Sequence, residues 1–132
     1  MYTDTQKEAL VKVQKNADIV CGKLNISYDL QGVQFIEKYI EKIKTEMSMQ
    51  EFESGPLPSM LGSFLGETII RNYGGAWVYD EQGFLCVGFD ETNAVYPIDK
   101  VRKQFENGLA DSVLDMYQTI APLFGHLFQS SS

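Results

Sequence analysis

The chain has 132 residues, of which 44% are apolar and 22% are charged, a composition that excludes an intrinsically disordered protein. This length is typical of a single domain, so we expect one domain over residues 1–132. The 18 Asp and Glu outnumber the 11 Lys and Arg, giving a formal net charge of -7. Such a charge argues against nucleic acid or anionic lipid as a partner, because phosphates would repel it. It would attract a basic protein, although it also serves solubility alone.

The sequence also bears on location. Its first residues show no basic stretch followed by an apolar one, and no run approaches 18 apolar residues, so we expect neither a secretory signal nor a membrane span. A cytoplasmic protein is the expectation. Cys21 and Cys86 fall in a predicted helix and a predicted strand, where free cysteine usually acts as a small buried hydrophobe. A disulfide is not expected in a reducing compartment.

Two helices are predicted in residues 1–50. Apolar residues recur at three- and four-residue steps from residue 4 to about residue 23, which indicates an amphipathic helix. A second stripe of this kind covers residues 33–47, and Asp29 is a suitable N-cap before it. Charged pairs on the second helix are both like and opposite in sign, so packing must stabilise it.

A central helix is predicted after a loop. Gly and two prolines over residues 52–58 predict the loop, and a mostly apolar helix follows from about residue 59 to the Gly pair at 74–75, which ends it. Gly62 and Gly66 lie on one face of this helix. Each costs about 1 kcal/mol relative to Ala, so we expect another segment to pack closely against them. A ligand-binding role is the alternative.

Three short strands are predicted next, over residues 76–79, 84–89 and 94–96, because β-branched and aromatic residues alternate with turn residues. They form an antiparallel meander, and so small a sheet needs a helix on one face. The acidic turns at 80–83 and 90–93 should lie at opposite ends of the meander. There we expect them to spread negative charge without forming one site.

Two helices complete the predicted α+β domain. One covers about residues 98–107, and the last begins near Asp111, with Pro122 bending or ending it. The central helix, the meander and these helices make up residues 59–126. Residues 129–132 are expected to form a frayed tail.

Candidate catalytic chemistry is sparse. Glu67 and Arg71 have the i,i+4 spacing of a helix ion pair, for which a structural role is the simpler interpretation. The alternative is a small hydrolase-like enzyme with Glu67 as general base. The single His126 lacks neighbours at metal-ligand spacing, and pairing it with Cys86 as a nucleophile needs a reactive thiol that a strand does not present. We therefore predict no catalytic residue, no metal site and no cofactor.

Surface binding is better supported by the sequence. Seven tyrosines could supply contact area with little loss of entropy, unless most of them lie in the core. The acidic turns could steer a basic partner, although Asp is favoured in turns for local reasons too. The predicted binding residues are Glu67, Arg71, Trp77, Tyr79, Asp80, Glu81, Asp90 and Glu91.

A set of short motifs resembles a family of small bacterial domains of unknown function. The motifs are Leu61-Gly-Ser-Phe-Leu-Gly-Glu67, Gly74-Gly-x-Trp-Val78, Val95-x-Pro97, Lys100-Val101 and Asn107-Gly108. The resemblance covers about residues 59–117, and its motifs are structural ones. Some relatives of this kind occur in settings that suggest toxin immunity. The resemblance implies no catalytic residue.

Three functional hypotheses follow. The first is a non-enzymatic binding protein of immunity or inhibitor type, whose acidic surface neutralises a more basic protein partner. The second is an enzyme that uses Glu67 in a cleft beside the central helix. The third is a structural protein that self-associates through its second helix or a sheet edge, which leaves monomer and homodimer both open.

Overall fold

The computed structural model describes residues 1–124, which form six α-helices, one 3-10 helix and a three-stranded antiparallel sheet. The predicted α+β class is confirmed. In chain order the elements are α1 (Asp4–Leu24), α2 (Leu30–Ile43), α3 (Met49–Ser54), α4 (Leu57–Tyr73), β1 (Ala76–Tyr79), β2 (Leu85–Gly88), β3 (Ala94–Val95), α5 (Pro97–Asn107), η1 (Gly108–Asp111) and α6 (Val113–Phe124).

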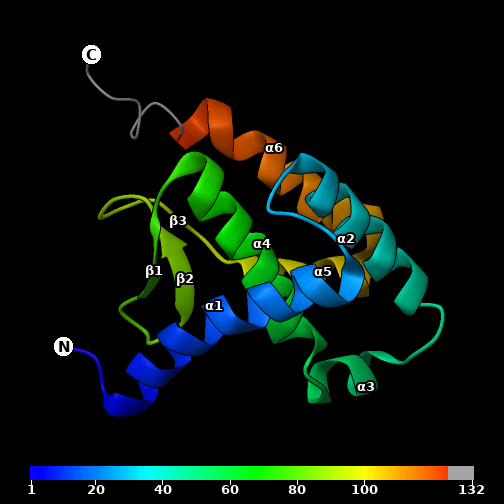
Figure 1. Ribbon diagram of the computed structural model, residues 1–132, viewed down its shortest axis with the longest axis horizontal. Coiled ribbons are helices and arrows are strands. Elements are labelled where there is room, and N and C mark those ends of the chain that lie inside the picture. The colour runs from blue at the N-terminus through cyan, green and yellow to red at the C-terminus, as the bar shows by residue number, and fades with distance from the viewer. Residues whose placement is uncertain (125–132) are drawn as a thin grey trace.

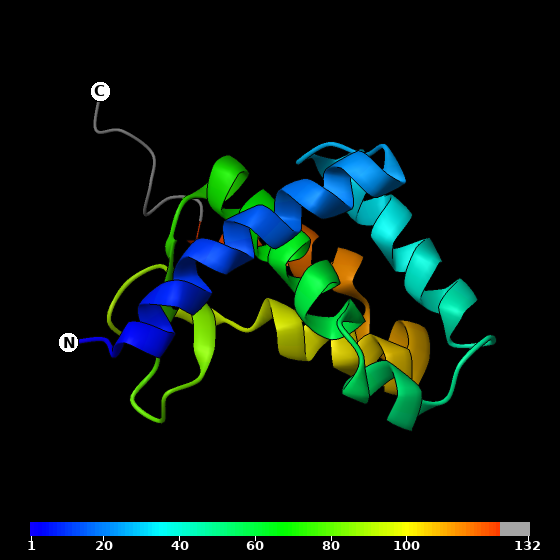
Figure 2. The same ribbon diagram turned by 60° about the horizontal axis from the view of Figure 1, so that its bottom comes forward.

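Helix α4 runs through the middle of the molecule (Figure 1), as its apolar sequence predicts. It contacts α1, α2, α3, α5, α6 and β2, and α1 lies across it in both views (Figures 1 and 2). The sheet lies at one end of the molecule and α3 at the other (Figure 1). One contiguous apolar cluster includes buried residues from all six α-helices and from β2. Burying this surface is the main stabilising term of the fold.

The two glycines of α4 are sites of close packing, as predicted. A Cβ added at Gly62 would lie 2.5 Å from the Cα of Ile98 in α5, and one added at Gly66 would lie 2.2 Å from the Trp77 ring in β1. Real Cβ atoms do not approach other carbons so closely. Because neither glycine has a side chain, α5 and the sheet can pack directly against the backbone of α4.

The predicted loop over residues 52–58 is wrong in most of its extent. Helix α3 covers Met49–Ser54 and α4 already begins at Leu57, so residues 55–56 alone separate two helices. Ser48 and Glu51 form a capping box that starts α3, and Pro58 lies in the first turn of α4, where its missing N–H is not needed.

The other predicted boundaries differ in smaller ways. The meander has the predicted order β1-β2-β3, but β2 and β3 are shorter than predicted. Helix α5 begins at Pro97 rather than after it, and α6 continues through Pro122 to Phe124. The predicted tail at 129–132 lies outside the described residues. None of the helices in residues 1–124 has the length and apolar character of a membrane span.

Candidate functional site

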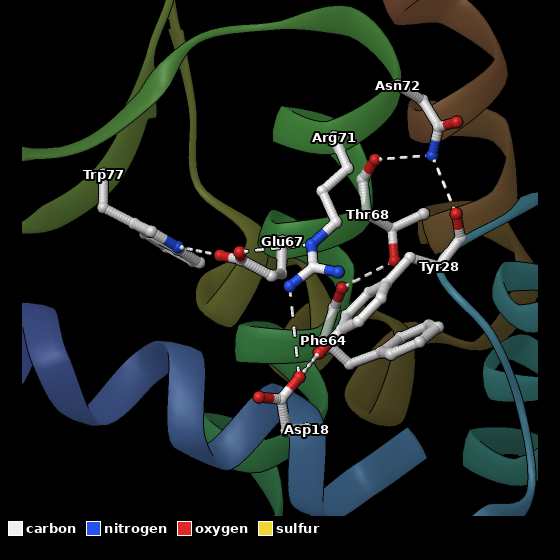
Figure 3. Close-up of polar contacts among 8 residues, drawn as sticks. All are labelled: Asp18, Tyr28, Phe64, Glu67, Thr68, Arg71, Asn72 and Trp77. Atoms are coloured by element: carbon white, nitrogen blue, oxygen red, sulfur yellow. Dashed lines mark hydrogen bonds and ion pairs between the residues drawn. The ribbon is translucent and has the colours of Figure 1, made fainter.

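The eight predicted binding residues fall into two groups that point in different directions. Glu67, Arg71 and Trp77 meet beside α4 in a partly buried polar network (Figure 3). The remaining five line a groove along the sheet, and they are Tyr79, Asp80, Glu81, Asp90 and Glu91. These two groups have different chemical roles.

The Glu67 carboxylate is 5% exposed and both of its oxygens are occupied. Its Oε2 accepts a hydrogen bond from Trp77 Nε1 at 3.0 Å, and its Oε1 accepts one from Arg71 Nε at 3.4 Å (Figure 3). The predicted i,i+4 ion pair is therefore present. A buried carboxylate is stable only when it is paired in this way.

The Arg71 guanidinium extends the network to α1. Its carbon lies 3.8 Å from the centre of the Tyr28 ring, a cation–π contact, and its Nη2 lies 4.0 Å from Asp18. The Tyr28 hydroxyl donates to Asp18 (Figure 3). Burial, with this hydrogen bond, raises the pKa of Tyr28, so the hydroxyl stays protonated and remains a donor. Asn72 of α4 also donates to the backbone carbonyl of Tyr28.

This network connects α1, α4, β1 and the loop that contains Tyr28. Two sizeable surface grooves on the described part of the chain lie along the sheet and α5, and Glu67 lines neither of them. With both oxygens bonded, and with neither of these grooves reaching it, the Glu67 carboxylate is arranged to hold β1 on α4 rather than to accept a substrate proton.

The outer face of the sheet carries the second group. Side chains alternate along a strand, so Trp77 and Val87 face the helices while Val78, Cys86 and Gly88 lie on the other face, where Cys86 is itself buried. A groove of about 480 Å³ follows this outward face, and we name it the acidic groove. Its lining residues are Val78, Tyr79, Asp80, Glu81, Gln82, Cys86, Gly88, Asp90, Glu91, Thr92, Asn93, Ala94 and Tyr96.

The acidic groove corrects one expectation. The turns at 80–83 and 90–93 do lie at opposite ends of the meander, yet both line this single groove. The reason is that only residues 84–89, which include β2, separate the turns, a span of at most about 23 Å at about 3.3 Å per residue. No Lys or Arg is among its lining residues, so nothing in the lining offsets the four carboxylates.

Two of these carboxylates shape the turns. Asp80 accepts hydrogen bonds from the backbone amides of Gln82 and Phe84, and Asp90 accepts from the amides of Thr92 and Asn93. The Tyr96 hydroxyl, followed by these amides, lowers the pKa of Asp80. The Asn93 side-chain amide is the largest cause of the lowered pKa of Asp90. Both groups therefore stay ionised while serving local geometry.

Glu81 and Glu91 differ from these aspartates. Each follows a turn-forming Asp, and within residues 1–124 neither side chain has a hydrogen bond or an ion pair. Their charges lie at the two ends of the acidic groove. They are consequently the carboxylates that can meet the cations of a partner without breaking an existing bond.

Tyr96 separates the acidic groove from a second one. Its hydroxyl donates to Asp80 Oδ2 at 2.7 Å, and this bond raises the pKa of Tyr96 to about 12. The second groove, of about 530 Å³, lies between the β1–β2 turn and the start of α5. We name it the Phe84 groove, and its lining residues are Asp80, Gln82, Phe84, Leu85, Tyr96, Ile98, Asp99 and Arg102.

Sequence reasoning missed the Phe84 groove. Phe84 was expected within a strand, but β2 begins one residue later and the Phe84 side chain is 61% exposed. Ile98 and Arg102 reach the groove because α5 begins at Pro97, directly after β3. The available signal was the position of Phe84 right after the turn Asp80–Gly83, where an aromatic residue can lie outside the sheet.

Tyr79 connects the sheet to the start of α1. Its backbone N–H donates to the Tyr2 hydroxyl at 3.4 Å, and its own hydroxyl donates to the carbonyl of Gln6 at 3.3 Å. The rings of Tyr2 and Tyr79 pack edge to face, with their centroids 5.3 Å apart. Tyr79 thus lines the acidic groove and also fixes the edge of β1.

Metal and thiol chemistry find little support in residues 1–124. No group of three His, Cys, Asp or Glu side chains in this range is placed to hold a metal ion. Burial raises the pKa of the Cys86 thiol, and the charge of Asp80 raises it further, which disfavours the reactive thiolate. His126, the other half of the proposed nucleophile pair, lies outside the described residues.

A scan against protein-family models, a search of curated proteins and a search of solved structures each found no match. The resemblance to a small bacterial family therefore stays a prediction.

Proposed function

We propose that this protein is a non-enzymatic binding protein whose outer sheet face binds a more basic protein. One observation carries the proposal: both acidic turns line a single groove, no Lys or Arg lines it, and Glu81 and Glu91 have no partner within the described chain. Charge of this kind steers an oppositely charged protein to the surface and favours it over acidic competitors.

The immunity or inhibitor form of this function rests on the resemblance and on the net charge of -7. In that form the partner is a basic toxin, and the acidic groove covers part of its cationic surface. A cytoplasmic location belongs to the same proposal, because an immunity protein of this type acts where the toxin would do its damage.

The test is affinity capture from native lysate at low and high salt, with the full chain as bait. Glu81→Lys with Glu91→Lys reverses the two unpaired charges of the acidic groove. Glu46→Lys with Glu53→Lys makes the same change in net charge at exposed positions next to and within α3, at the other end of the molecule (Figure 1). We expect a basic protein to be captured at low salt by the wild type and the α3 variant only.

Two results would count against the proposal. Recovery of no partner at either salt would remove the binding function. Equal loss of the partner from both double variants would show that total charge, and not the acidic groove, governs capture.

The alternative of an enzyme using Glu67 gains no support from the geometry, because both carboxylate oxygens are bonded inside the fold. Glu67→Gln separates the two ideas. Loss of an activity with the fold intact would favour the enzyme, whereas loss of stability alone would favour a structural role in which Glu67 connects β1 to α4. Self-association is tested by light scattering at high concentration, where a monomeric mass would dismiss it.

A further inference from the structure

The acidic groove and the Phe84 groove are neighbours that share three lining residues. Asp80, Gln82 and Tyr96 line both grooves, and the hydrogen bond from Tyr96 to Asp80 forms the ridge between them. A ligand that lies along the outer sheet face and continues past the β1–β2 turn therefore passes from one groove directly into the other.

The two grooves differ in charge. In the Phe84 groove, Asp80 is engaged by Tyr96 and by the turn, Asp99 pairs with Lys103 at 3.3 Å, and Arg102 adds a positive charge. The acidic groove has no such compensation. The Phe84 groove thus has little net charge to offer a partner.

The Phe84 groove is instead apolar along one wall. Phe84, Leu85 and Ile98 supply that wall, and Phe84 is 61% exposed although it is among the largest apolar side chains of the chain. Covering such a side chain with another apolar group removes its surface from water, which is favourable by about 25 cal/mol per Å².

We infer that these adjoining grooves bind an extended segment of a basic protein that carries two cationic side chains and, next to one of them, an apolar side chain. This inference rests on the proposed function. Glu81 and Glu91 receive the cations, and because at most about 23 Å separates the turns, the cations are about seven residues apart in an extended chain. The apolar side chain follows the cation at Glu81, since the Phe84 groove opens at that end.

The inference is tested with three synthetic peptides of equal length and the isotope-labelled full chain, followed by amide NMR. The first peptide has two Lys seven residues apart and a Leu beside the second Lys, in a Gly/Ser background. The second peptide replaces Leu with Ser, and the third replaces both Lys with Gln. All three are titrated at low salt, where charge attraction is least screened.

We expect the first peptide to bind about tenfold more tightly than the second, which corresponds to about 1.4 kcal/mol. The first peptide should shift the amides of Phe84, Leu85 and Ile98 in addition to those of Glu81 and Glu91. The second should shift only the latter pair, and the third should produce no shifts.

Two exposed apolar residues provide a matched pair of variants. Phe84→Ser should abolish the tenfold difference without changing the affinity of the Leu-free peptide. Leu109→Ser, at a position 59% exposed in η1, should keep the difference. The shift pattern on the wild-type chain gives the same information if Phe84→Ser does not fold.

The possible failures are distinguishable. Equal affinity of the two Lys peptides, or a tenfold difference that survives Phe84→Ser, would overturn the role of the Phe84 groove and leave the proposed function standing. Absence of shifts at Glu81 and Glu91 with either Lys peptide would overturn both the inference and the proposed function.

Discussion

At the scale of single residues, Gly66 determines how the sheet meets α4. The Trp77 ring lies where a side chain at residue 66 would be, and from there its Nε1 reaches the Glu67 carboxylate. The absence of one Cβ thus permits both a close packing contact and a buried hydrogen bond. The tryptophan that the sequence suggests as a binding residue is used inside the fold.

Gly66→Ala should therefore destabilise the protein. Its Cβ would overlap the Trp77 ring at 2.2 Å, and overpacking of this kind costs about 1–3 kcal/mol. Gly22→Ala is the control, because a Cβ in that position of α1 meets nothing within 4 Å and Ala is better in a helix by up to about 1 kcal/mol. Urea unfolding measures both, and a loss of stability in Gly22→Ala equal to that in Gly66→Ala would contradict the explanation.

Asp80 makes a second residue-scale prediction, on pH. Its pKa is lowered in the folded protein, chiefly by the Tyr96 hydroxyl. A lowered folded pKa means stabilisation that is present above the unfolded value of about 4 and lost as the pH falls through the folded value. Asp80→Asn should thus reduce the loss of stability between about pH 5 and pH 2 in equilibrium unfolding.

The same variant has a second readout at high pH. The pKa of Tyr96 is about 12 because of its bond to Asp80, so Asp80→Asn should lower it toward the ordinary value of about 10. Glu81→Gln removes a neighbouring carboxylate that has no partner within the described residues, and it serves as the control of equal charge change. A Tyr96 titration that Asp80→Asn leaves unchanged would count against the hydrogen bond.

Residue-scale chemistry was predictable where the partners are close in sequence. Asp29 as an N-cap and the Glu67–Arg71 pair follow from spacings of three and four residues. The contacts of Arg71 with Tyr28 and Asp18 were not predictable, because those residues lie 43 and 53 positions away. Only the tertiary packing of α1 on α4 brings them together.

At the scale of elements, the Glu67 network is the connection between α4 and the sheet. Trp77 is the single tryptophan of the chain, and its hydrogen bond to Glu67 links β1 to α4. Its fluorescence therefore reports directly on this connection.

Substitutions at Glu67 should show a graded effect. Glu67→Gln keeps an acceptor for Trp77 but loses the charge that pairs with Arg71, and we expect the free energy of unfolding to fall by about 1–2 kcal/mol. Glu67→Ala also leaves the Trp77 N–H without its acceptor, so it should cost more and shift the Trp77 emission. Equal stability of both variants and the wild type would contradict a structural role for Glu67.

Helix α3, which the sequence analysis did not predict, does have a local signal in the sequence. Ser48, the N-cap of helix α3, and Glu51 have the capping-box spacing. That signal outweighs the prolines that follow, because Pro58 falls in the first turn of α4, where proline is tolerated. The strands were predicted from their composition, but the end of β3 depends on where α5 begins.

At the scale of the whole molecule, the negative charge has one concentrated position. The net charge of -7 is a property of composition, whereas the acidic groove requires two turns that a strand of only four residues keeps within about 23 Å of each other. The sequence analysis identified the acidic residues of this groove, but it expected the two turns not to form one site. The length of β2 decides whether the two turns share one groove or lie apart, and the hydrophobic periodicity of a sequence does not fix strand ends well.

The most direct test of the central claim is hydrogen–deuterium exchange of the full chain, with and without the basic protein that it captures. In the turns at 80–83 and 90–93, the amides of Glu81 and Glu91 have no hydrogen-bond acceptor within the described residues, so a bound segment should slow their exchange. We predict that protection is concentrated in residues 78–96 and at the start of α5, with α2 and α3 unchanged. Protection on α2 or α3, with the two turns unaffected, would contradict the assignment of the binding surface to the outer face of the sheet.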